Sequence, residues 1–332
     1  MSTSFDSFID AFNTTMTEEQ FQEMYSPFQY IPTGWVGITF LVLFGMTTTA
    51  HLFEAIYFQT TYMIPTLVLC GVGELLGWGG RYWGHTDPLS RDAFMMQIST
   101  TIISPSFMTA AMFLILPKII NELGVEFSRM PPRLYSIIFI TVDVTALVIQ
   151  AIGGGMASVA EAFEAAEQAI GGGMASVAEA FEAAEQGAHI MLSGIIIQLA
   201  AVVLYTILGL EFIVRFAYNR PARPSAASEP RKYAGWNDVS RNIVWMLVGL
   251  AIATMLIIMR SIYRTIELSD GWNGGIIAIE KWFNWFDGAP IVVAMFAFNL
   301  LHPGYLLKSL ESDNKLPVSQ SSTSDPKGMT QV

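Results

Sequence analysis

The chain has 332 residues, of which 52% are hydrophobic and only 14% are charged, and its formal net charge at pH 7 is −11. Soluble globular domains carry about 25% charged residues, so this composition excludes an ordinary water-soluble fold. The acidic balance also argues against a nucleic-acid partner, because such a partner requires a clustered basic surface. The composition therefore indicates an integral membrane protein.

Residues 1–32 form an acidic segment ahead of the first apolar stretch. Its charged residues are Asp6, Asp10, Glu18, Glu19 and Glu23, and it contains no Lys or Arg. A cleavable signal peptide begins with a basic region before its apolar core, and this segment lacks that region. Asn13-Thr14-Thr15 is an N-glycosylation sequon, which makes Asn13 a glycosylation candidate if the segment lies outside the cell.

Seven apolar stretches follow, each long enough to cross a membrane as a helix, which takes about 20 residues. They cover residues 34–58, 63–83, 93–121, 133–153, 188–216, 239–266 and 282–307. The second stretch is the weakest, because Glu74 and a run of glycines lower its hydropathy. The sequence thus predicts an all-α membrane domain of seven transmembrane helices over residues 33–308.

The distribution of basic residues predicts the orientation of these helices. Basic residues gather in the third connection, in the fifth connection and after the last stretch. They are Lys118, Arg129 and Arg133, then Arg215, Arg220, Arg223, Arg231, Lys232 and Arg241, and finally Lys308, Lys315 and Lys327. With seven crossings these three regions share one side, which the positive-inside rule makes cytoplasmic. We expect an external N-terminus and a disordered cytoplasmic tail over residues 309–332.

A perfect tandem repeat lies between the fourth and fifth stretches. Residues 151–168 read AIGGGMASVAEAFEAAEQ, and residues 169–186 repeat them letter for letter. Repeat folds have diverged copies, usually three or more, so a recent duplication in a tolerant loop explains the identity better. Each copy places glutamates and apolar residues on different helix faces, but a helix of about 13 residues is marginal in water. The sequence therefore predicts an acidic external loop over residues 151–186, with a lid over a substrate path as the alternative.

Ionisable and amide side chains within the apolar stretches are the candidate functional residues. A charge at the bilayer centre costs about 2.5–3.5 kcal/mol on insertion scales, so such residues usually face the bundle interior. The candidates for a substrate path are His51, Glu54, Glu74, Arg81, Asp143, Gln150, Gln198, Arg260, Arg264, Glu267, Asp287, Asn299 and His302. Several are seven residues apart, a spacing that returns to nearly the same helix face. We expect these polar stripes to share an interior; pairing that merely fixes the bundle is the alternative.

Common catalytic and nucleotide-binding motifs are absent from the sequence. It contains no G-x-x-x-x-G-K-[ST], no H-E-x-x-H and no G-x-S-x-G. We therefore expect no ATPase, no catalytic residues and no cofactor. Two alternatives use histidines within the stretches. His51 and His302 with Asp143 would ligate zinc in an intramembrane hydrolase, although Asp143 lies toward the mid-plane. The same two histidines would instead ligate haem.

Six segments, in order, resemble a known family. They read IPTGWVGITFLVLF, GELLGWGGRYWG, ISPSFMTAAMFLILPKII, FITVDVTALVIQAIGGG, RSIYRTIELSDG and FDGAPIVVAMFAFNLLHPG. Together they cover nearly the whole membrane domain and resemble the fungal RTA-like lipid-translocating exporters, which include sphingoid long-chain-base exporters. The most specific features are the pair Asp143 and Gln150, the run from Arg260 to Glu267, and the closing His302-Pro303-Gly304. The duplicated segment departs from the family pattern.

This resemblance implies a multi-pass protein of the plasma membrane, or of an endomembrane, that moves lipids or protects against toxic amphiphiles without its own ATPase. The leading hypothesis is export of a cationic single-chain amphiphile, such as a long-chain base, whose ammonium group is received by Glu74, Asp143 and Asp287. Arginines of the same helices either neutralise these acids or bind a phosphate. The second hypothesis is a receptor-like sensor of lipid stress whose segment 216–241 binds a cytoplasmic partner.

Overall fold

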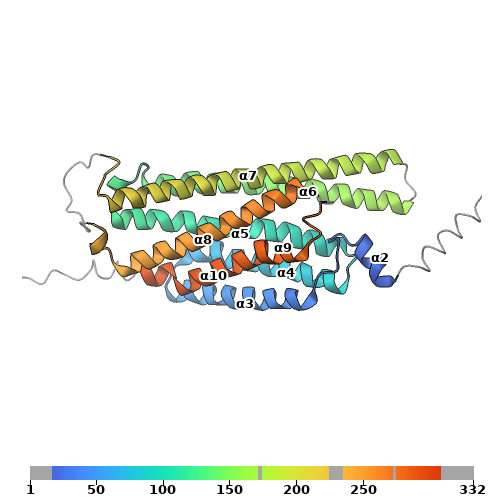
Figure 1. The fold of residues 1–332 in the computed structure, drawn as a ribbon, viewed down its shortest axis with the longest axis horizontal. Coiled ribbons are helices and arrows are strands. Elements are labelled where there is room, and N and C mark those ends of the chain that lie inside the picture. Colours follow the sequence, from blue (N-terminus) through green and yellow to red (C-terminus); the bar gives the residue numbers. More distant parts are fainter. Residues whose placement is uncertain (1–16, 171–173, 224–234, 272–273, 308–332) are drawn as a thin grey trace, which may run out of the picture.

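The computed structural model is all-helical, and seven of its helical segments are long and apolar enough to cross a membrane (Figure 1). The structure describes residues 17–170, 174–223, 235–271 and 274–307, and no strand occurs among them. The side chains of residues 18–19 and 160–181 are not part of this description. The glycosylation candidate Asn13 and the predicted tail, residues 309–332, also lie outside the described residues.

A short helix, α2 (Glu18–Tyr25), precedes the spans. The spans are α3 (Gly34–Tyr57); the turns η1 (Thr61–Met63) and η2 (Ile64–Val68) with α4 (Leu69–Thr86); α5 (Arg91–Leu123); α6 (Pro132–Ile170); α7 (Met174–Ala217); α8 (Arg241–Ser269); and α9 (Glu280–Phe283) with η5 (Asn284–Gly288) and α10 (Ala289–Leu300). Two 3₁₀ turns, η3 (Val125–Phe127) and η4 (Trp236–Asp238), lie in connections. The predicted number and type of spans are confirmed.

Helix α5 lies at the centre of the bundle. Of its most apolar window, 72% is buried, compared with 28% for α6. Consecutive spans pack side by side, and the last span packs against both α3 and α8. Large apolar side chains such as Trp35, Ile56 and Met255 are exposed on the outer surface, as a lipid-facing surface requires. Polar residues of α5 are therefore placed on the axis of the bundle.

Pro105 interrupts the backbone hydrogen bonding of α5. Proline has no N–H, so the carbonyl four residues earlier, on Thr101, loses its helical partner. The helix continues through Pro105, and the Thr101 carbonyl instead accepts a hydrogen bond from Nη2 of Arg260 on α8. Backbone polar groups inside a membrane need such a partner. The proline thus creates an attachment point for an arginine.

The described residues of the duplicated segment are helical, so the prediction of a loop without regular structure is corrected for them. The first copy extends α6 and most of the second lies in α7, so the copies form opposite arms of a hairpin. The hairpin projects past the other spans at the end of the bundle that carries α2 (Figure 1). Ala and Glu are strong helix formers. Extending two existing helices also avoids nucleation, the costly step that makes a short isolated helix marginal.

Close packing of glycines joins the two arms at the base of this hairpin. A Cβ added to Gly153 would lie 2.4 Å from the backbone nitrogen of Met191 and 2.5 Å from the carbonyl oxygen of Gly187. One added to Gly155 would have no neighbour within 4 Å. Small residues allow such close approach of helices in membranes.

We expect Gly153→Leu to lower the free energy of unfolding by about 1–3 kcal/mol, the usual cost of overpacking. Gly155→Leu is the matched control and should leave stability unchanged or slightly higher, because glycine is a poor helix former. Thermal unfolding of the purified protein in detergent measures both variants. Equal melting temperatures would contradict the close helix approach at Gly153.

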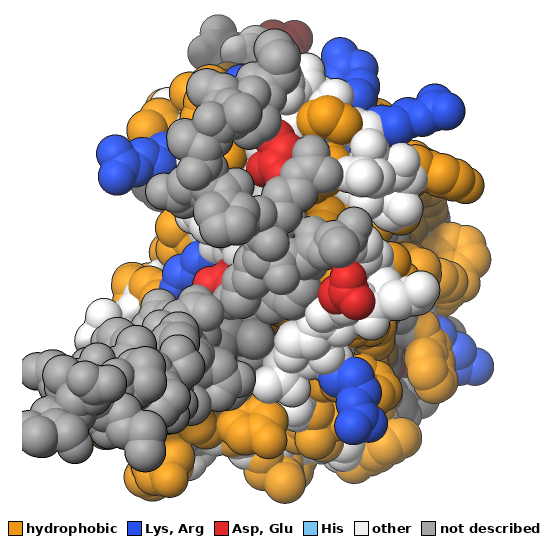
Figure 2. All heavy atoms as spheres, turned by 90° about the vertical axis from the view of Figure 1, so that its left-hand side faces the viewer, with side chains coloured by type: hydrophobic (Ala, Val, Ile, Leu, Met, Phe, Trp, Pro, Cys, Tyr) orange, Lys and Arg blue, Asp and Glu red, His pale blue; other side chains and the backbone are white. Residues whose placement is uncertain are grey.

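The basic residues of the third and fifth connections lie at one end of the bundle. Helices α5 and α7 end there and α6 and α8 begin there, and blue Lys and Arg side chains surround this face in Figure 2. The described residues of this group are Lys118, Arg129, Arg133, Arg215, Arg220, Arg223 and Arg241. Within the segment 216–241, residues 224–234 lie outside the description. The charge asymmetry read from the sequence is thus a property of the folded bundle.

Candidate functional site

The predicted site residues face the interior of the bundle. Ten of the thirteen residues are at most 5% exposed, and the other three, Glu54, Gln198 and Asn299, are partly exposed. The described side chains do not form one continuous polar stripe. They divide into separate clusters, because a charge removed from water is stable only beside an opposite charge or a good hydrogen-bond partner.

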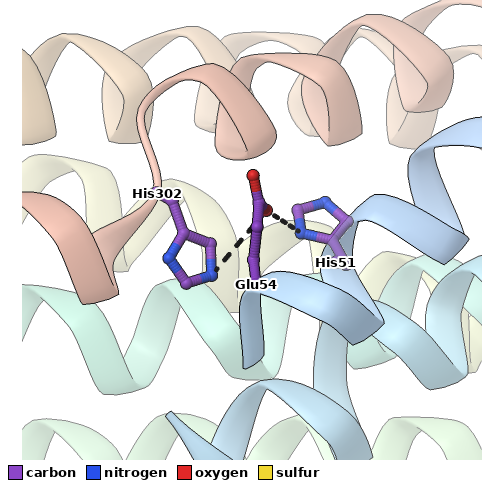
Figure 3. A group of neighbouring side chains, drawn as sticks. All are labelled: His51, Glu54 and His302. Atoms are coloured by element: carbon purple, nitrogen blue, oxygen red, sulfur yellow. Dashed lines mark ion pairs between the residues drawn. The ribbon is translucent and has the colours of Figure 1, made fainter. Parts of the chain in front are cut away.

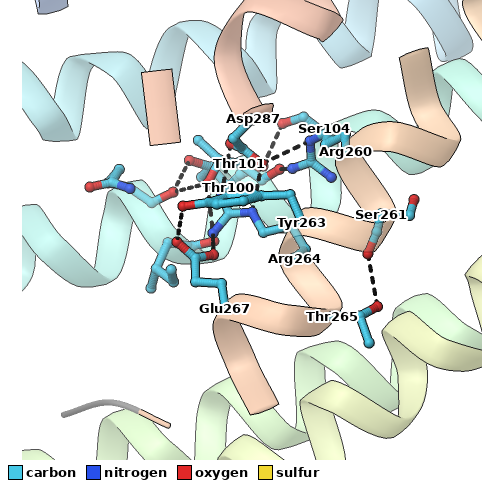
Figure 4. Close-up of polar contacts among 12 residues, drawn as sticks. Thr100, Thr101, Ser104, Arg260, Ser261, Tyr263, Arg264, Thr265, Glu267 and Asp287 are labelled. Carbon is cyan, nitrogen blue, oxygen red and sulfur yellow. Dashed lines mark hydrogen bonds and ion pairs between the residues drawn. The ribbon is translucent and has the colours of Figure 1, made fainter. Parts of the chain in front are cut away.

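The first group, the arginine cluster, joins α8 to α5 and η5 (Figure 4). Its members are Thr101, Arg260, Tyr263, Arg264, Glu267 and Asp287. Arg264 donates from Nε and Nη2 to the two oxygens of Asp287 at 2.6 and 2.8 Å. Its Nη1 donates to Glu267 at 2.7 Å, and its Nη2 also donates to Thr101 Oγ1 at 2.8 Å. This guanidinium therefore connects three segments of the chain.

Two further contacts complete the arginine cluster. Nε of Arg260 lies 3.0 Å from Oδ1 of Asp287, and the hydroxyl of Tyr263 donates to Glu267 at 2.7 Å. Asp287 reaches the arginines from η5, a π-helical turn of a kind that often occurs at functional sites. The cluster holds two arginines and two carboxylates, so its formal charges balance. Because both oxygens of Asp287 bind Arg264, Asp287 is not an open acceptor for an ammonium group.

A second group surrounds Arg81 near the opposite end from the basic face. Its Nη2 donates to the Tyr30 hydroxyl at 2.8 Å and to Glu280 at 3.1 Å, and Nη1 donates to Gln97 at 3.4 Å. Glu280 also accepts from the backbone N–H and the hydroxyl of Thr33 at 2.9 and 2.6 Å. Burial raises the pKa of the Tyr30 phenol above its usual value, although Arg81 beside it opposes that rise. Arg81 thus ties the N-terminal segment to the last span.

The third group, the Asp143 cluster, lies between α5, α6 and α7. Its members are Ser106, Thr109, Asp143, Gln150 and Gln198. Thr109 donates to Oδ2 of Asp143 at 2.7 Å, Gln198 donates to Ser106 at 2.9 Å, and Gln150 donates to Gln198 at 3.0 Å. Oδ1 of Asp143 and Oε1 of Gln150 are buried and have no hydrogen-bond partner. Buried acceptors rarely remain unpaired, so these two atoms call for a donor.

A seam between α7 and α8, over α5, leads to this cluster. A gap of about 10 Å³, lined in part by Thr109, Gln198 and Arg260, separates the Asp143 cluster from the arginine cluster. This volume is about that of one water molecule. Ile257 borders the gap, and its neighbour Ile258 borders a groove of about 330 Å³ along the same seam. The groove and the gap have no lining residue in common, but both lie between the same three helices, α5, α7 and α8.

The groove itself is almost entirely apolar and open to the side. Its lining residues are Leu116, Tyr205, Thr206, Gly209, Leu210, Ile213, Leu247, Leu250, Ala251, Thr254, Met255 and Ile258. Leu210 is 56% exposed and Met255 is 71% exposed, so the groove faces the surface that lipid covers. Its volume falls within the range of about 300–1,000 Å³ typical of ligand pockets. The groove is therefore open on the outer, apolar surface of the bundle.

The fourth group brings His51 and Glu54 of α3 beside His302, which follows α10 (Figure 3). Nδ1 of His51 lies 3.5 Å from Oε2 of Glu54, and Nε2 of His302 lies 3.9 Å from the same oxygen. Asp143, the third residue of the zinc alternative, belongs to another cluster, and the carboxylate beside the two histidines is that of Glu54. Glu54 also lies between the two imidazole rings, where a porphyrin bound by both histidines would have to pass (Figure 3).

Two predicted residues make no hydrogen bond to these groups, although Glu74 lies within electrostatic range of Arg260, Arg264 and Asp287 in the arginine cluster. Both carboxylate oxygens of Glu74 are buried without a hydrogen-bond partner, and so is the indole N–H of Trp78 one turn further along α4. Asn299 donates to the hydroxyl of Thr47 at 2.8 Å, which joins α10 to α3. Neither Glu74 nor Asn299 makes a hydrogen bond to the described residues of the Asp143 cluster.

The sequence interpretation did not identify several residues that hold these clusters together. The role of Thr101 could have been inferred from the sequence. Pro105, four positions later, has no N–H, so the carbonyl of Thr101 needs a hydrogen-bond donor from outside the helix. Thr109 and Ser106 are uncharged hydroxyl residues in an apolar helix, and only their neighbours on α6 and α7 distinguish them. Glu280 lies just outside the predicted last stretch and had no sequence signal.

Comparison with known proteins identifies the family. The profile of the family described as RTA1 like protein matches residues 67–167 and 165–310, and the two matches meet inside the duplicated segment. Three relatives come from Saccharomyces cerevisiae. Sphingoid long-chain base transporter RSB1 of strain Lalvin EC1118 is 26% identical over 306 residues, covering 84% of this chain and 73% of the relative.

Protein RTA1 of strain ATCC 204508 / S288c is 26% identical over 241 residues, covering 72% of this chain and 65% of the relative. Protoporphyrin uptake protein 1 of the same strain is 22% identical over 238 residues, covering 71% of this chain and 67% of the relative. No solved structure matches the chain. The family profile covers six of the seven spans completely or nearly so. The chain belongs to the RTA1-like protein family.

Proposed function

We propose that this protein moves single-chain amphiphiles with a cationic head group, of the sphingoid long-chain-base type, across the membrane. The similarity to a relative named sphingoid long-chain base transporter supports this proposal. The observation that carries it is the seam formed by α5, α7 and α8. An apolar groove of about 330 Å³ lies along this seam, and so does the small gap lined by Thr109 and Gln198, whose cluster holds a buried carboxylate with an unpartnered oxygen. An amphiphile has the same division into an apolar chain and a polar end.

The chemistry of the Asp143 cluster fits an ammonium group. A primary ammonium has three N–H donors and no acceptor. Oδ1 of Asp143 and Oε1 of Gln150 are both acceptors without a donor. Arg260 and Arg264 face the same gap but are already bound in the arginine cluster. We therefore assign the acceptor role to Asp143 rather than to Asp287.

Passage of a head group requires movement of the helices along the seam. The gap beside Gln198 and Arg260 has a volume of only about 10 Å³, too small for an ammonium group with its first carbons. The helices α7 and α8 meet across it and carry no ion pair with each other among the described residues. We propose that they separate as the head group moves from the groove toward the Asp143 cluster.

The direction of the bundle in the membrane is also part of the proposal. The end of the bundle with the basic residues of α5, α6, α7 and α8 faces the cytoplasm under the positive-inside rule. We accordingly propose that the duplicated hairpin and α2 lie on the external side, and that the chain resides in the plasma membrane or in an endomembrane. The proposed transport needs no ATPase and no cofactor in this chain.

A substitution that fills the groove provides a test in proteoliposomes. We expect Gly209→Phe to reduce the flux of a labelled sphingoid base at least fivefold, because the aromatic ring would occupy the groove where the apolar chain lies. A Cβ at Gly209 meets only Leu116 Cδ2 at 3.5 Å, so the position accepts a side chain. The matched control is Gly79→Phe on α4, where an added Cβ has no neighbour within 4 Å.

The assay compares vesicles containing the wild-type protein, each variant or no protein. Flux through the wild type no faster than in empty vesicles would overturn the transport proposal, and it would favour the alternative of a lipid sensor. Flux that is equal in Gly209→Phe and Gly79→Phe would show that the groove is not the path.

A further inference from the structure

The cluster of His51, Glu54 and His302 has the composition of a metal site. Each residue offers one ligand atom, and the three atoms lie within 4.8 Å of one another. The two measured separations to Oε2 of Glu54 are 3.5 and 3.9 Å. Zinc binds imidazole nitrogen and carboxylate oxygen at about 2.0–2.2 Å, which in a tetrahedron separates ligand atoms by about 3.3–3.6 Å. The separations to Glu54 are thus within a few tenths of an ångström of this range, and the two histidine nitrogens, which lie within 4.8 Å of each other, would move together on binding.

The atoms that face one another are the ones without partners. Nδ1 of His51, Oε2 of Glu54 and Nε2 of His302 are all buried and make no hydrogen bond. His51 is fully buried and His302 is 2% exposed. Three unpaired polar atoms at one point are unusual in a folded protein, where buried polar groups nearly always have partners. A cation placed between them would satisfy all three.

The backbone holds His51 in the form that a metal requires. Its Nε2 lies 3.1 Å from the carbonyl oxygen of Met295, which only accepts, so Nε2 carries the ring proton. Nδ1 consequently presents a lone pair toward Glu54. A ligating histidine whose other nitrogen donates to a carbonyl is the usual arrangement in metal sites.

His302 needs a rearrangement. The backbone N–H of Gly304 lies 3.1 Å from Nδ1 of His302, so in this geometry the neutral ring carries its proton on Nε2. Metal coordination through Nε2 moves that proton to Nδ1 and gives up the Gly304 contact. The ion would offset this loss at His51 and Glu54. There the Nδ1 lone pair and the carboxylate oxygen Oε2 face each other at 3.5 Å with no donor between them, and a cation would bind both.

We propose that His51, Glu54 and His302 bind a divalent transition-metal ion of the zinc class. Two imidazoles and one carboxylate suit zinc, and three protein ligands leave a fourth position for water or an oxygen of a bound molecule. A cavity also lies beside the site. The ring of Phe58 stacks on His302 with centroids 5.2 Å apart, and Phe58, Pro303 and Gly304 line a cavity of about 480 Å³ at the basic end of the bundle. The ion would link α3 to the segment after α10.

Metal content of the full-length protein tests the proposal independently of transport. The protein is purified in detergent with a tag that contains no histidine, incubated with ZnCl₂ and desalted, and zinc is measured by mass spectrometry. We expect about one zinc ion per chain and a rise in melting temperature with zinc. Glu54→Gln and His302→Ala should each weaken zinc binding at least tenfold, because each removes one of three ligands.

The matched control is His189→Ala, which removes an exposed imidazole on α7 that is far from the cluster in sequence. This variant should bind zinc as the wild type does. Glu54→Gln is nearly isosteric, so its monodispersity in size-exclusion chromatography establishes that the loss is not due to unfolding. Zinc content that is absent from the wild type, or equal in the wild type and Glu54→Gln, would overturn the metal assignment.

Discussion

Replacing Arg264 with glutamine is expected to lower the free energy of unfolding by about 3–5 kcal/mol, the range for removing one partner of a buried ion pair. Arg264 is 1% exposed and donates to both oxygens of Asp287, to Glu267 and to Thr101. The substitution leaves two carboxylates with only Arg260 to balance them in a medium that solvates charge poorly. Within the arginine cluster, only the contacts of Arg260 to the Thr101 carbonyl and to Asp287 would then join α8 to α5 and to the last span.

A double-mutant cycle separates the charge imbalance from the lost packing. The double variant Arg264→Gln with Asp287→Asn removes one charge of each sign, and Arg260 and Glu267 remain balanced. We expect it to be less destabilised than the sum of the two single variants by at least 1 kcal/mol, as for other residues in one network. Thermal and denaturant unfolding in detergent provide the values. Arg220→Gln, at an exposed position after α7, serves as the control and should change stability little.

An additive cycle would show that the arginine cluster is not an energetic unit. A melting temperature of Arg264→Gln equal to that of Arg220→Gln would show that its ion pairs do not stabilise the bundle. Either result would also weaken the assignment of Asp143 as the ammonium acceptor, because that assignment assumes that Arg264 keeps Asp287 occupied.

Asp143→Asn is expected to reduce the flux of a sphingoid base at least tenfold while the protein remains folded. In the wild type the hydroxyl of Thr109 donates to Oδ2 of Asp143 at 2.7 Å. The amide oxygen of asparagine can still accept this hydrogen bond. The neutral amide removes the negative charge, however, and its NH₂ group repels an ammonium donor. A tenfold effect corresponds to about 1.4 kcal/mol of lost interaction at the barrier. Initial rates in proteoliposomes, at matched protein density, give the ratio.

Two controls make this result specific. Asp238→Asn removes an exposed carboxylate from η4 and should transport at the wild-type rate. An N-acylated sphingoid base has no ammonium charge, so its slower movement should be the same in the wild type and in Asp143→Asn. A variant that keeps full flux of the cationic base would exclude Asp143 as its acceptor. An unchanged melting temperature confirms that the fold is intact.

The seven spans followed from the sequence because they depend on local composition. A backbone inside lipid must satisfy its hydrogen bonds internally, so an apolar stretch of about 20 residues has few alternatives to a helix. The inward position of charged residues followed for the same reason, since exposure of Asp143 or Arg264 to hydrocarbon is costly. The location of the basic connections at one end of the bundle also followed from the sequence. Once the number of spans is known, the third and fifth connections must lie on the same side.

The duplicated segment marks where local reasoning failed. Each copy considered alone is marginal as a helix, and the sequence therefore predicted a loop. In the structure the copies continue α6 and α7, and the contact between Gly153 and Gly187 aligns the two arms. Helix stability there comes from continuing helices that already exist and from packing of the two arms against each other. The sequence of one copy alone reveals neither contribution.

The partners of each buried polar group were decided only by the tertiary structure. Helix periodicity predicts which face carries Asp287 or Glu54, but not which face of another helix lies opposite it. The rotation of α8 against η5 neutralises Asp287 with two arginines, and the close approach of α3 to the end of α10 places Glu54 between two histidines. The energy of an ion pair depends on the distance between the charges and on their desolvation. Small differences in helix rotation therefore determine which carboxylate is bound by arginine and which carboxylate oxygen has no hydrogen-bond partner.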